Sequence, residues 1–480
     1  MSTLIARDTT RRRTWSSISR ALPFLLVALG AGAAVAITGE LSIQYQLAAV
    51  LALAVLPSLA VLYTTKPHVV INGYIFLIPL LVSGPPGATT GADTPSTINP
   101  GIIATVLIIG IGLPMMLLDP RPVPRRLRSV VWPLIALGSL GLLSVLVNSA
   151  TSLGDISNAV VKYFMFGVAA LLVYRYNDTE PKVRSLMRAL LLGGAVVAVY
   201  AIALFVLGKS YYPQYGYSRA AGTFENWNEL GGYMSLIAFP MAMFGLANRR
   251  SGVRFVVLCA TGLTLIALLL SLTLGSVLGV VVGSFVGAVI FFRKRLGRVI
   301  AVAILAGIVG AAVWHLVPAV SQKFAATNSR VEGRVAGYLV GLEAFKSNML
   351  IGVGGESQVL QAVLATTDPG QRRVTVVPHN AFLAIGVEKG IFGSILLLVL
   401  VVNALRLLGR WQGGDDPEFR LWHYGILLGM IAFLVQNMSN LLILHSRLGV
   451  LVVAMLALDM RLQHLSKHAT PSRADLASHK

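Results

Sequence analysis

The chain has 480 residues, of which 56% are hydrophobic and only 12% are charged. Its mean hydropathy of +0.76 excludes an ordinary soluble domain, in which roughly a quarter of the residues are charged. The net charge of +20 could indicate a nucleic-acid-binding protein, but the basic residues lie in short connections between apolar runs, not along one polar face. Composition therefore predicts an integral membrane protein and argues against nucleic acid as a partner.

Apolar runs of transmembrane length recur along most of the chain. We predict an all-α, polytopic transmembrane helical bundle of about fourteen helices, each about 17–24 residues long. The expected helices cover residues 21–38, 46–64, 69–84, 101–118, 130–149, 158–175, 186–207, 229–247, 254–272, 275–292, 299–317, 381–404, 421–441 and 446–462. Arg11-Arg12-Arg13 before the first run resembles the start of a signal peptide, but the many later spans favour a retained signal anchor. The single cysteine, Cys259, is expected to be a buried, small apolar side chain.

The distribution of positive charge orients these helices. With a cytoplasmic N-terminus, roughly 28 of the 39 Lys and Arg residues lie on the cytoplasmic side, including the clusters at 121–128, 249–254 and 293–298. The predicted organisation is a cytoplasmic tail over residues 1–20, a transmembrane region over 21–317, an extracytoplasmic loop over 318–380, three transmembrane helices over 381–462 and a cytoplasmic tail over 463–480.

Two extracytoplasmic loops are candidates for the chemistry. The loop at 208–228 and the much longer loop at 318–380 hold most of the basic residues that face outward against the general bias. They include Arg219, Lys323, Arg330, Arg334, Lys346, Arg372 and Arg373. Arg372 and Arg373 stand in a polar stretch and fit an ordinary solvated loop. The segment at 83–100, rich in Gly, Pro and Thr, is expected to be a plain surface loop.

An amphipathic helix is expected in the long loop. The residues Val335, Tyr338, Leu339, Leu342 and Phe345 recur with helical period, which predicts a helix lying on the outer face. Asn328 or Ser329 is a plausible N-cap.

This helix would carry two cations near its start. Arg330 falls in the first turn and Arg334 one turn later on the same face. Cations there oppose the helix dipole and repel each other, each effect costing some tenths of a kcal/mol, roughly 0.2–1. A bound anion would relieve both effects, so the pattern predicts a phosphate or diphosphate clamp. Ion pairs with Glu332 or Glu343 are the structural alternative.

His379 stands at the outer mouth of the helix that begins near Asn380. The positive end of the helix dipole favours neutral imidazole, which can take a proton from a hydroxyl nucleophile. A lone histidine is also often structural, so spacing alone leaves both roles open. No second His or carboxylate stands at metal-ligand spacing, so no metal site and no cofactor are expected.

Further polar residues are predicted inside or at the ends of the last helices. Glu388 lies a few turns into the membrane beside Lys389, and an internal ion pair is the favoured account, with Gly390 and Gly393 allowing close helix approach. Asn437, Asn440 and His445 cluster near the outer ends of the last two helices. They either line the same cavity or join helices by hydrogen bonds.

Taken together, these segments resemble the O-antigen ligase and O-antigen polymerase superfamily of bacterial surface-glycan enzymes. That family shows an Arg, a Gly-Thr-Phe stretch and an Asn-rich turn before a helix. Its outer loop then has an Arg, an amphipathic helix, a Gly-rich turn and a His-Asn pair leading into a helix with Glu and Gly. In this chain the matching positions are Arg219, Gly222-Thr223-Phe224, Asn226-Trp227-Asn228, Arg334, Gly352-Val353-Gly354-Gly355, His379-Asn380 and Glu388-Lys389-Gly390.

The motif stretches span roughly residues 217 to 395, and their order and predicted topological side both match. Three positions depart from the family pattern. The usual Pro-Asn is Trp227-Asn228, Met349 replaces the Pro expected before the Gly-rich turn, and Leu274-Gly275-Ser276 replaces the Ser-Arg-Gly often seen after the ninth helix. Any role of that last Arg is absent here or has moved.

The resemblance implies a GT-C-like glycosyltransferase of the bacterial inner (plasma) membrane, with its active site on the extracytoplasmic face. Such enzymes transfer a glycan from a polyprenyl diphosphate carrier, usually undecaprenyl diphosphate, to a hydroxyl of a glycan, glycolipid or protein acceptor, with inversion and without a metal. Carried over by motif, Arg219, Arg330 and Arg334 would bind the diphosphate, and His379 would activate or orient the acceptor. Asn228, Tyr338, Asn380 and Glu388 would support them, and the lipid chain would lie in a groove among the helices.

Rival functions stay open at this point. A polymerase adds the glycan to another carrier-linked glycan, whereas a ligase adds it to a lipid or protein; about fourteen spans slightly favour the polymerase. A transporter of a small anionic solute would need internal repeats and charged or helix-breaking residues at the midplane. No repeat is visible in this sequence, and the basic residues predicted to face outward gather in the two outer loops.

Overall fold

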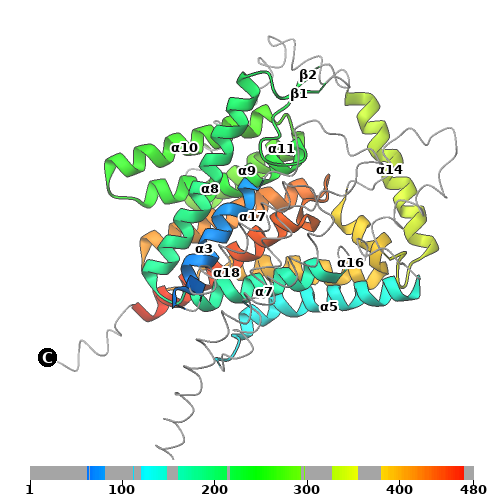
Figure 1. Cartoon of the computed structure of the whole chain (residues 1–480), viewed down its shortest axis with the longest axis horizontal. Helices are drawn as coiled ribbons and strands as arrows, with labels where there is room; N and C mark the ends of the chain where they lie inside the picture. The colour runs from blue at the N-terminus through cyan, green and yellow to red at the C-terminus, as the bar shows by residue number, and fades with distance from the viewer. Residues whose placement is uncertain are drawn as a thin grey trace, which may run out of the picture. The chain divides into compact units, whose positions relative to one another are not determined.

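The computed structural model describes residues 62–63, 65–81, 112, 121–148, 160–212, 217–292, 297, 327–354 and 380–469. The chain separates into two compact units, Met1–Tyr74 and Ile75–Lys480, and all the helices from η1 onward belong to the second. Apart from a two-residue hairpin, in which β1 (Tyr211–Tyr212) pairs antiparallel with β2 (Tyr217–Ser218), the regular structure of the described residues is helical (Figure 1). The predicted all-α class is confirmed.

The helices have well-defined bounds. They are α3 (Pro67–Leu77), η1 (Ile78–Leu80), α5 (Arg125–Val147), α7 (Lys162–Tyr176), α8 (Glu180–Val206), α9 (Trp227–Ala247), α10 (Ser251–Leu270), α11 (Leu274–Phe292), α14 (Thr327–Ser347), α16 (Ala381–Leu408), α17 (Pro417–Asn437), η6 (Leu442–Leu444) and α18 (Ser446–Ala469). Among the described residues eight helices are long and apolar enough to cross a membrane: α5, α8, α9, α10, α11, α16, α17 and α18.

These eight helices coincide with eight of the expected spans, so a polytopic helical membrane protein is confirmed, whereas the count of fourteen is not. The described parts of two further expected spans are helical: the 15-residue α7 falls in the span at 158–175, and the apolar stretch Pro67–Leu80 falls in the span at 69–84, whose last residues lie outside the described part of the chain. The expected helices at 21–38 and 299–317, and nearly all of those at 46–64 and 101–118, lie outside the described residues.

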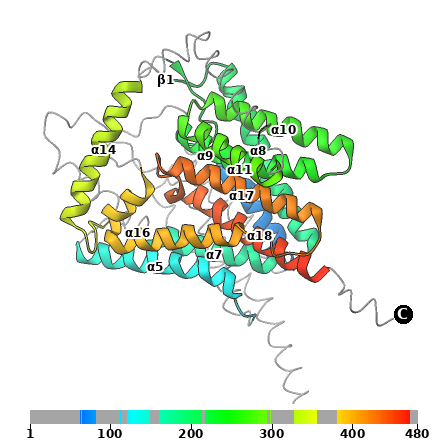
Figure 2. The ribbon, with the colours of Figure 1, turned by 180° about the vertical axis from the view of Figure 1, so that it is seen from behind.

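The helices pack as antiparallel neighbours. α9 contacts α10 and α17, α17 contacts α11, and α5 lies beside α7 and α16 in both views (Figures 1 and 2). Small residues allow the closest approaches: a Cβ on Gly429 of α17 would stand 2.2 Å from the Leu236 carbonyl oxygen of α9. Membrane helices use such small residues to bring backbones together because lipid provides no hydrophobic drive between helices.

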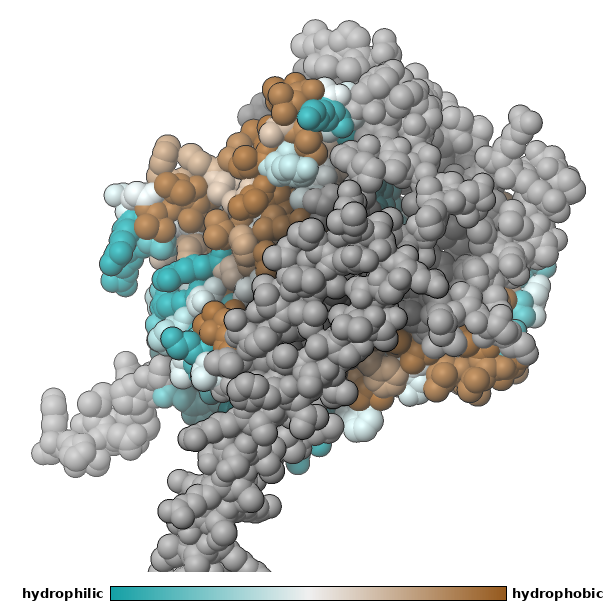
Figure 3. Space-filling model, in the orientation of Figure 1, coloured by the Kyte–Doolittle hydropathy of each residue, from teal (hydrophilic) through white to brown (hydrophobic). Residues whose placement is uncertain are grey.

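Large apolar side chains cover much of the outer surface. Phe255 and Val256 of α10 are 69% and 65% exposed, and Leu192 of α8 is 56% exposed. Figure 3 shows apolar residues gathered over this part of the molecule. A soluble protein rarely exposes so continuous an apolar surface, whereas a membrane span must. Cys259 of α10 is also exposed, so the prediction that it is buried was wrong. A small apolar side chain on a lipid-facing helix needs no protein cover.

Cross-helix bonds define two ends of this bundle. We call the end that holds Arg219, Asn228, Asn380 and Met438 the motif end, because Gln436 Nε2 donates to the Asn228 carbonyl (2.9 Å) there. At the opposite, basic end, Arg184 of α8 pairs with Glu418 of α17, and Arg126 of α5 donates to Gln463 of α18 (3.3 Å). The predicted motifs of α9 and α16 therefore meet at one end.

Candidate functional site

The start of α9 is built by the Asn-rich turn that the sequence singled out. Gly222 has a φ of +62°, a conformation that favours glycine, and bends the chain beside Ala201. Asn226 caps the helix by accepting from the backbone N–H groups of Asn228 (2.9 Å) and Glu229 (3.0 Å). Its amide also donates to the Glu229 carboxylate (2.6 Å). The cap thus fixes the position of Glu229 at the motif end.

Glu229 lies at the centre of a buried group of charges. The carboxylate is 2% exposed and lies 3.8 Å from the Arg447 guanidinium and 3.7 Å from Nδ1 of His445. Arg447 also lies 3.7 Å from the exposed carboxylate of Glu225, and it donates to the Leu81 carbonyl (2.7 Å). A buried charge needs partners of this kind, and here the start of α18 supplies them to the start of α9. We call the buried pair Glu229 and Arg447, together with the more exposed Glu225 and His445 beside them, the buried charge cluster.

Sequence reasoning missed Arg447, and it named His445 without a partner. A signal was present: Arg447 is a basic residue near the start of a predicted helix, on the side where the charge bias disfavours it. It was overlooked because it lies outside the loops at 208–228 and 318–380, which hold most of the other basic residues predicted to face outward.

Arg219, a predicted diphosphate ligand, is buried next to this group. Its Nε donates to the Ser271 carbonyl (3.0 Å) and its Nη2 to the Leu272 carbonyl (2.9 Å), and its guanidinium stacks on the Trp227 ring at 4.0 Å. Since these carbonyls belong to the turn between α10 and α11, Arg219 ties that turn to the start of α9. The structure therefore gives it a clear bracing contact.

Asn228 and the end of α17 connect α9 to the last helices. The Asn228 side chain accepts from the Thr273 hydroxyl (3.4 Å), and its carbonyl accepts from Gln436. Asn437 accepts from the backbone N–H of Ile443 (2.7 Å), and Asn440 donates to the Gln436 carbonyl (3.4 Å). Of the two roles left open for Asn437 and Asn440, these contacts match hydrogen bonding in the turn between α17 and α18.

Two predicted supporting residues converge on the end of α17. The Tyr338 hydroxyl of α14 donates to the Met438 carbonyl (3.0 Å), and so does the Asn380 amide (3.2 Å). Asn380 also caps α16 by accepting from Phe382 N–H (2.9 Å) and Leu383 N–H (3.1 Å). The outer-loop helix and the residue that directly follows His379 are therefore held at one carbonyl.

The helix expected in the long loop is α14, which begins at Thr327 rather than after Asn328 or Ser329. Arg330 and Arg334 lie in its first two turns; their side chains and all of His379 are outside what the structure describes. The side of α14 that contacts the protein is only partly the side that carries its periodic apolar residues. Ala344 is buried against Val353 and Val387, whereas Val335, Leu339 and Leu342 are 49%, 63% and 42% exposed. Phe345 and Val340 also pack against this buried group, so α14 contacts α16 through Ala344 and these two side chains while its other large apolar residues are exposed.

The Gly-rich turn after α14 docks into a break in α16. Gly390 interrupts the helix with a φ of +69° and a ψ of −168°, which frees backbone groups. Val353 N–H donates to the Val387 carbonyl (2.8 Å), Gly354 N–H to Glu388 (3.0 Å), and Ile391 N–H to Met349 (2.7 Å). A broken helix at membrane depth is tolerated only when such groups find partners in the protein. Two separately recognised motifs are thus one structural unit.

The predicted internal pair lies at this break. The Lys389 ammonium is 2.8 Å from the Glu388 carboxylate, and both side chains are buried. Ser144 of α5 donates to the Glu388 carbonyl (3.0 Å). Glu388 therefore supports the architecture of α16, as the pairing alternative predicted.

No group of three or more His, Cys, Asp or Glu side chains in the described part of the chain is arranged to hold a metal ion. The chemistry visible there is electrostatic: buried guanidinium groups, paired carboxylates and a partly exposed imidazole at the ends of α9, α16, α17 and α18.

Comparison with known proteins agrees with the motifs. Residues 255–398 match the family model described as O-antigen ligase, a range that includes α14 and the break in α16. The exopolysaccharide production protein ExoQ of Rhizobium meliloti (strain 1021) is 26% identical over 361 residues, which cover 69% of this chain and 78% of that protein. The resemblance predicted from the sequence is confirmed.

Proposed function

Starting from this resemblance to the O-antigen ligase and polymerase superfamily, we propose that the protein is a membrane glycosyltransferase of cell-envelope polysaccharide assembly. It moves a glycan from a polyprenyl diphosphate carrier, such as undecaprenyl diphosphate, to an acceptor hydroxyl. The name of the similar protein, which refers to exopolysaccharide production, favours a growing glycan as the acceptor and hence a polymerase. A ligase that adds the glycan to a glycolipid or protein is the close alternative.

The proposed site lies at the motif end, on the extracytoplasmic side of a bacterial inner membrane. This orientation, with both termini cytoplasmic, follows from the charge bias, because the opposite end carries most of the arginines. The lipid of the donor would lie along the apolar helices with its diphosphate at their ends.

The reaction divides between two sets of side chains. The acceptor oxygen attacks the anomeric carbon from the face opposite the diphosphate, so a new C–O bond forms with inversion while the bond to the diphosphate oxygen breaks. The acceptor proton passes to His379, and the diphosphate leaves with the bonding electron pair. Arg330 and Arg334 of α14, with Arg219, neutralise the charge that develops on the leaving group. This role of arginine requires no metal.

The observation that carries this proposal is the shared contact at Met438. Tyr338 lies one helical turn beyond Arg334, and Asn380 directly follows His379; both donate to the same carbonyl. Transfer requires Arg334 and His379 to share one space, and anchors one helical turn and one residue away from them support this requirement of the proposal. The buried charge cluster forms the adjoining polar wall, in which His445 is 40% exposed beside Glu229.

The test is a transfer assay with purified protein and a polyprenyl diphosphate-linked oligosaccharide. We expect product that depends on this donor, persists in the presence of a chelator, and has the opposite anomeric configuration. His379→Ala should lower the rate about 100-fold or more, the usual contribution of a general base. Binding and vectorial movement of a small anion without any glycan product would support a transporter instead. Near-normal transfer by His379→Ala would remove this histidine as the base.

A further inference from the structure

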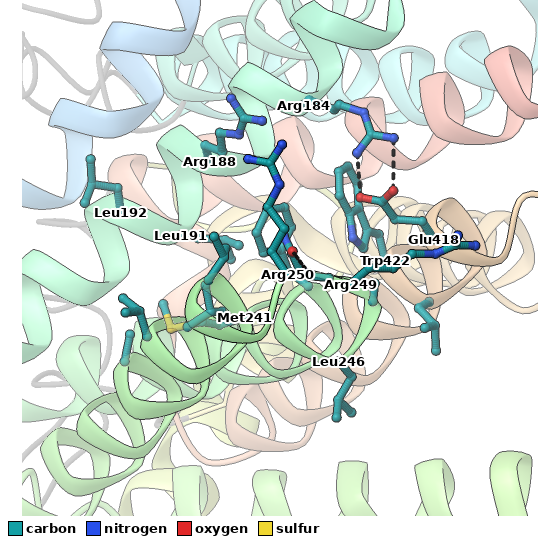
Figure 4. A pocket seen from close by; sticks show the side chains of 18 of the residues that line it. Arg184, Arg188, Leu191, Leu192, Met241, Leu246, Arg249, Arg250, Glu418 and Trp422 are labelled. Atoms are coloured by element: carbon teal, nitrogen blue, oxygen red, sulfur yellow. Dashed lines mark hydrogen bonds and ion pairs between the residues drawn. The ribbon is translucent and has the colours of Figure 1, made fainter.

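A large cavity lies at the basic end, far along the helices from the proposed transfer site. Its volume is about 890 Å³, and α8, α9, α10 and α17 form its walls (Figure 4). Cavities of roughly 300–1,000 Å³ are of the size that takes a small ligand. None of the residues assigned to glycan transfer lines it, so its role is separate from that reaction.

Two carboxylates at the cavity are already engaged. Glu418 accepts from Arg184 through bonds of 2.5 and 3.0 Å, drawn as dashed lines in Figure 4. Asp416 caps α17 by accepting from the backbone N–H groups of Glu418 (2.9 Å) and Phe419 (3.2 Å). The Arg184 guanidinium also lies 5.4 Å from the Trp422 ring centroid. These contacts fix one side of the cavity and leave little negative charge free.

Three further arginines line the cavity and differ from Arg184, which is paired with Glu418. Arg188 of α8, and Arg249 and Arg250 just before α10, line it without a carboxylate partner among the described residues. In Figure 4 the side chains of Arg188 and Arg250 extend toward one another. The start of α10 adds backbone N–H groups with no side-chain cap. Guanidinium groups gathered in this way match the oxygen atoms of a phosphate.

The rest of the lining is apolar and opens toward the lipid-facing surface. Leu192 is 56% exposed, Leu246 45% and Val256 65%, and all three belong to helices long and apolar enough to span a membrane. A small water-soluble anion would make no contact with this apolar wall. An acidic protein segment would place further charged groups next to it. The ligand that satisfies both parts has an anionic phosphate at one end and hydrocarbon chains at the other.

We propose that this cavity binds one anionic phospholipid from the membrane leaflet at the basic end. The phosphate lies among Arg188, Arg249 and Arg250, and an acyl chain follows the apolar wall between α8 and α10. The site does not depend on glycan transfer, because it is formed by other residues at the other end of the helices.

The experiment is native mass spectrometry of the full chain in detergent, with equimolar phosphatidylglycerol and phosphatidylcholine of matched acyl chains. Wild-type protein should retain the anionic lipid preferentially. Replacing Arg188, Arg249 and Arg250 together by Gln should lower this preference by about fivefold per arginine, the factor expected of one basic side chain at an anionic surface. Arg254→Gln is the matched control, because Arg254 is an exposed arginine near the start of the same helix that does not line the cavity. Ala260→Trp, which narrows the apolar wall, should reduce retention of both lipids.

Three results would overturn the proposal. One is equal retention of the two lipids by wild-type protein. Another is an equal loss of preference in Arg254→Gln and the triple variant. The third is displacement of the lipid by glycerol phosphate or an acidic peptide at equal concentration, which would indicate a free-phosphate site or a protein site. If the triple variant does not fold, the single change Arg249→Gln is compared with Arg254→Gln in its place, with the same readout.

Discussion

Arg219 and Arg447 at the motif end are held differently from three of the arginines at the basic end. At the motif end Arg219 and Arg447 are 6% and 7% exposed, and each is engaged by carbonyl oxygens or carboxylates. At the basic end Arg188, Arg249 and Arg250 are exposed at the mouth of a cavity. A buried charge needs partners, whereas an exposed one keeps its water and costs little. The two ends therefore hold charge for different reasons.

This difference shows why the number of charges is a poor guide to their function. The charge bias places most of the arginines at the basic end, where their first effect is on membrane orientation. At the motif end Arg219 and Arg447 are buried, and each required specific partners. Variants that compare matched residues at the two ends test this distinction directly.

The largest effect is expected from Arg447→Ala. This change leaves Glu229 buried without its guanidinium partner, and breaking a buried pair in this way costs about 3–5 kcal/mol. The matched change at the basic end, Arg254→Ala, should alter the free energy of unfolding by no more than about 0.5 kcal/mol. Denaturant unfolding in mixed micelles measures both. Similar small losses would show that the two ends do not differ in the way proposed.

A second comparison sharpens the motif end itself. Arg334→Glu should lower glycan transfer about 100-fold, the loss typical when one donor to a developing anion is removed. Arg372→Glu makes the same charge change in the same predicted loop but in a polar stretch, and its transfer rate should stay within about twofold of wild type. Initial rates with the lipid-linked donor decide the matter. Equal effects would contradict a specific diphosphate clamp.

A third prediction concerns the break that joins the loop to α16. A Cβ at Gly390 would lie 2.2 Å from the Leu350 carbonyl oxygen, and the residue has a φ of +69°. Gly390→Ala should therefore cost about 2–3 kcal/mol, since a side chain is strained in this conformation and the backbone oxygen cannot move away easily.

The control for Gly390→Ala is Gly262→Ala, inside α10. A Cβ there meets nothing within 4 Å, and alanine favours a helix over glycine by up to about 1 kcal/mol. The free energy of unfolding, measured for both variants in the same micelles, should fall for Gly390→Ala and rise for Gly262→Ala. Comparable stability of both would mean that the docked turn contributes little.

The sequence was sufficient for the helices because their signal is local. A run of apolar residues long enough for a bilayer is visible without knowing any contact, and eight such runs became helices close to their predicted bounds. What it did not reveal was the side that packs. In α14 the apolar residues that recur with helical period divide: Phe345 packs toward α16, whereas Leu339 and Leu342 are exposed. Within a membrane large apolar residues can face lipid while small ones make the helix contact.

The site was predictable only where a motif contained both partners. Glu388 and Lys389 are neighbours in the sequence, so their pair was foreseen. Glu229 and Arg447 are far apart in the sequence, and no local pattern links them. Likewise, the meeting of Tyr338 and Asn380 at one carbonyl depends on the end of α17, which lies beyond both in the chain.

The smallest effect distinguishes two exposed histidines, one at each end. His445→Ala should lower glycan transfer about tenfold, because its ring lies 3.7 Å from the buried Glu229 carboxylate and a small misplacement of a polar wall already slows a positioned reaction. His464→Ala changes a histidine whose ring meets that of His468 edge to face at the basic end, and transfer should be unaffected. Initial rates at saturating donor, together with the KM for the acceptor, measure the difference.

A fall in rate with His445→Asn as large as with alanine would point to a proton-transferring role, whereas rescue by asparagine would indicate that hydrogen bonding alone positions the acceptor. Equal rates for His445→Ala and wild type would place the buried charge cluster outside the reacting space, and the functional contrast between the two ends would then rest on α14 and His379.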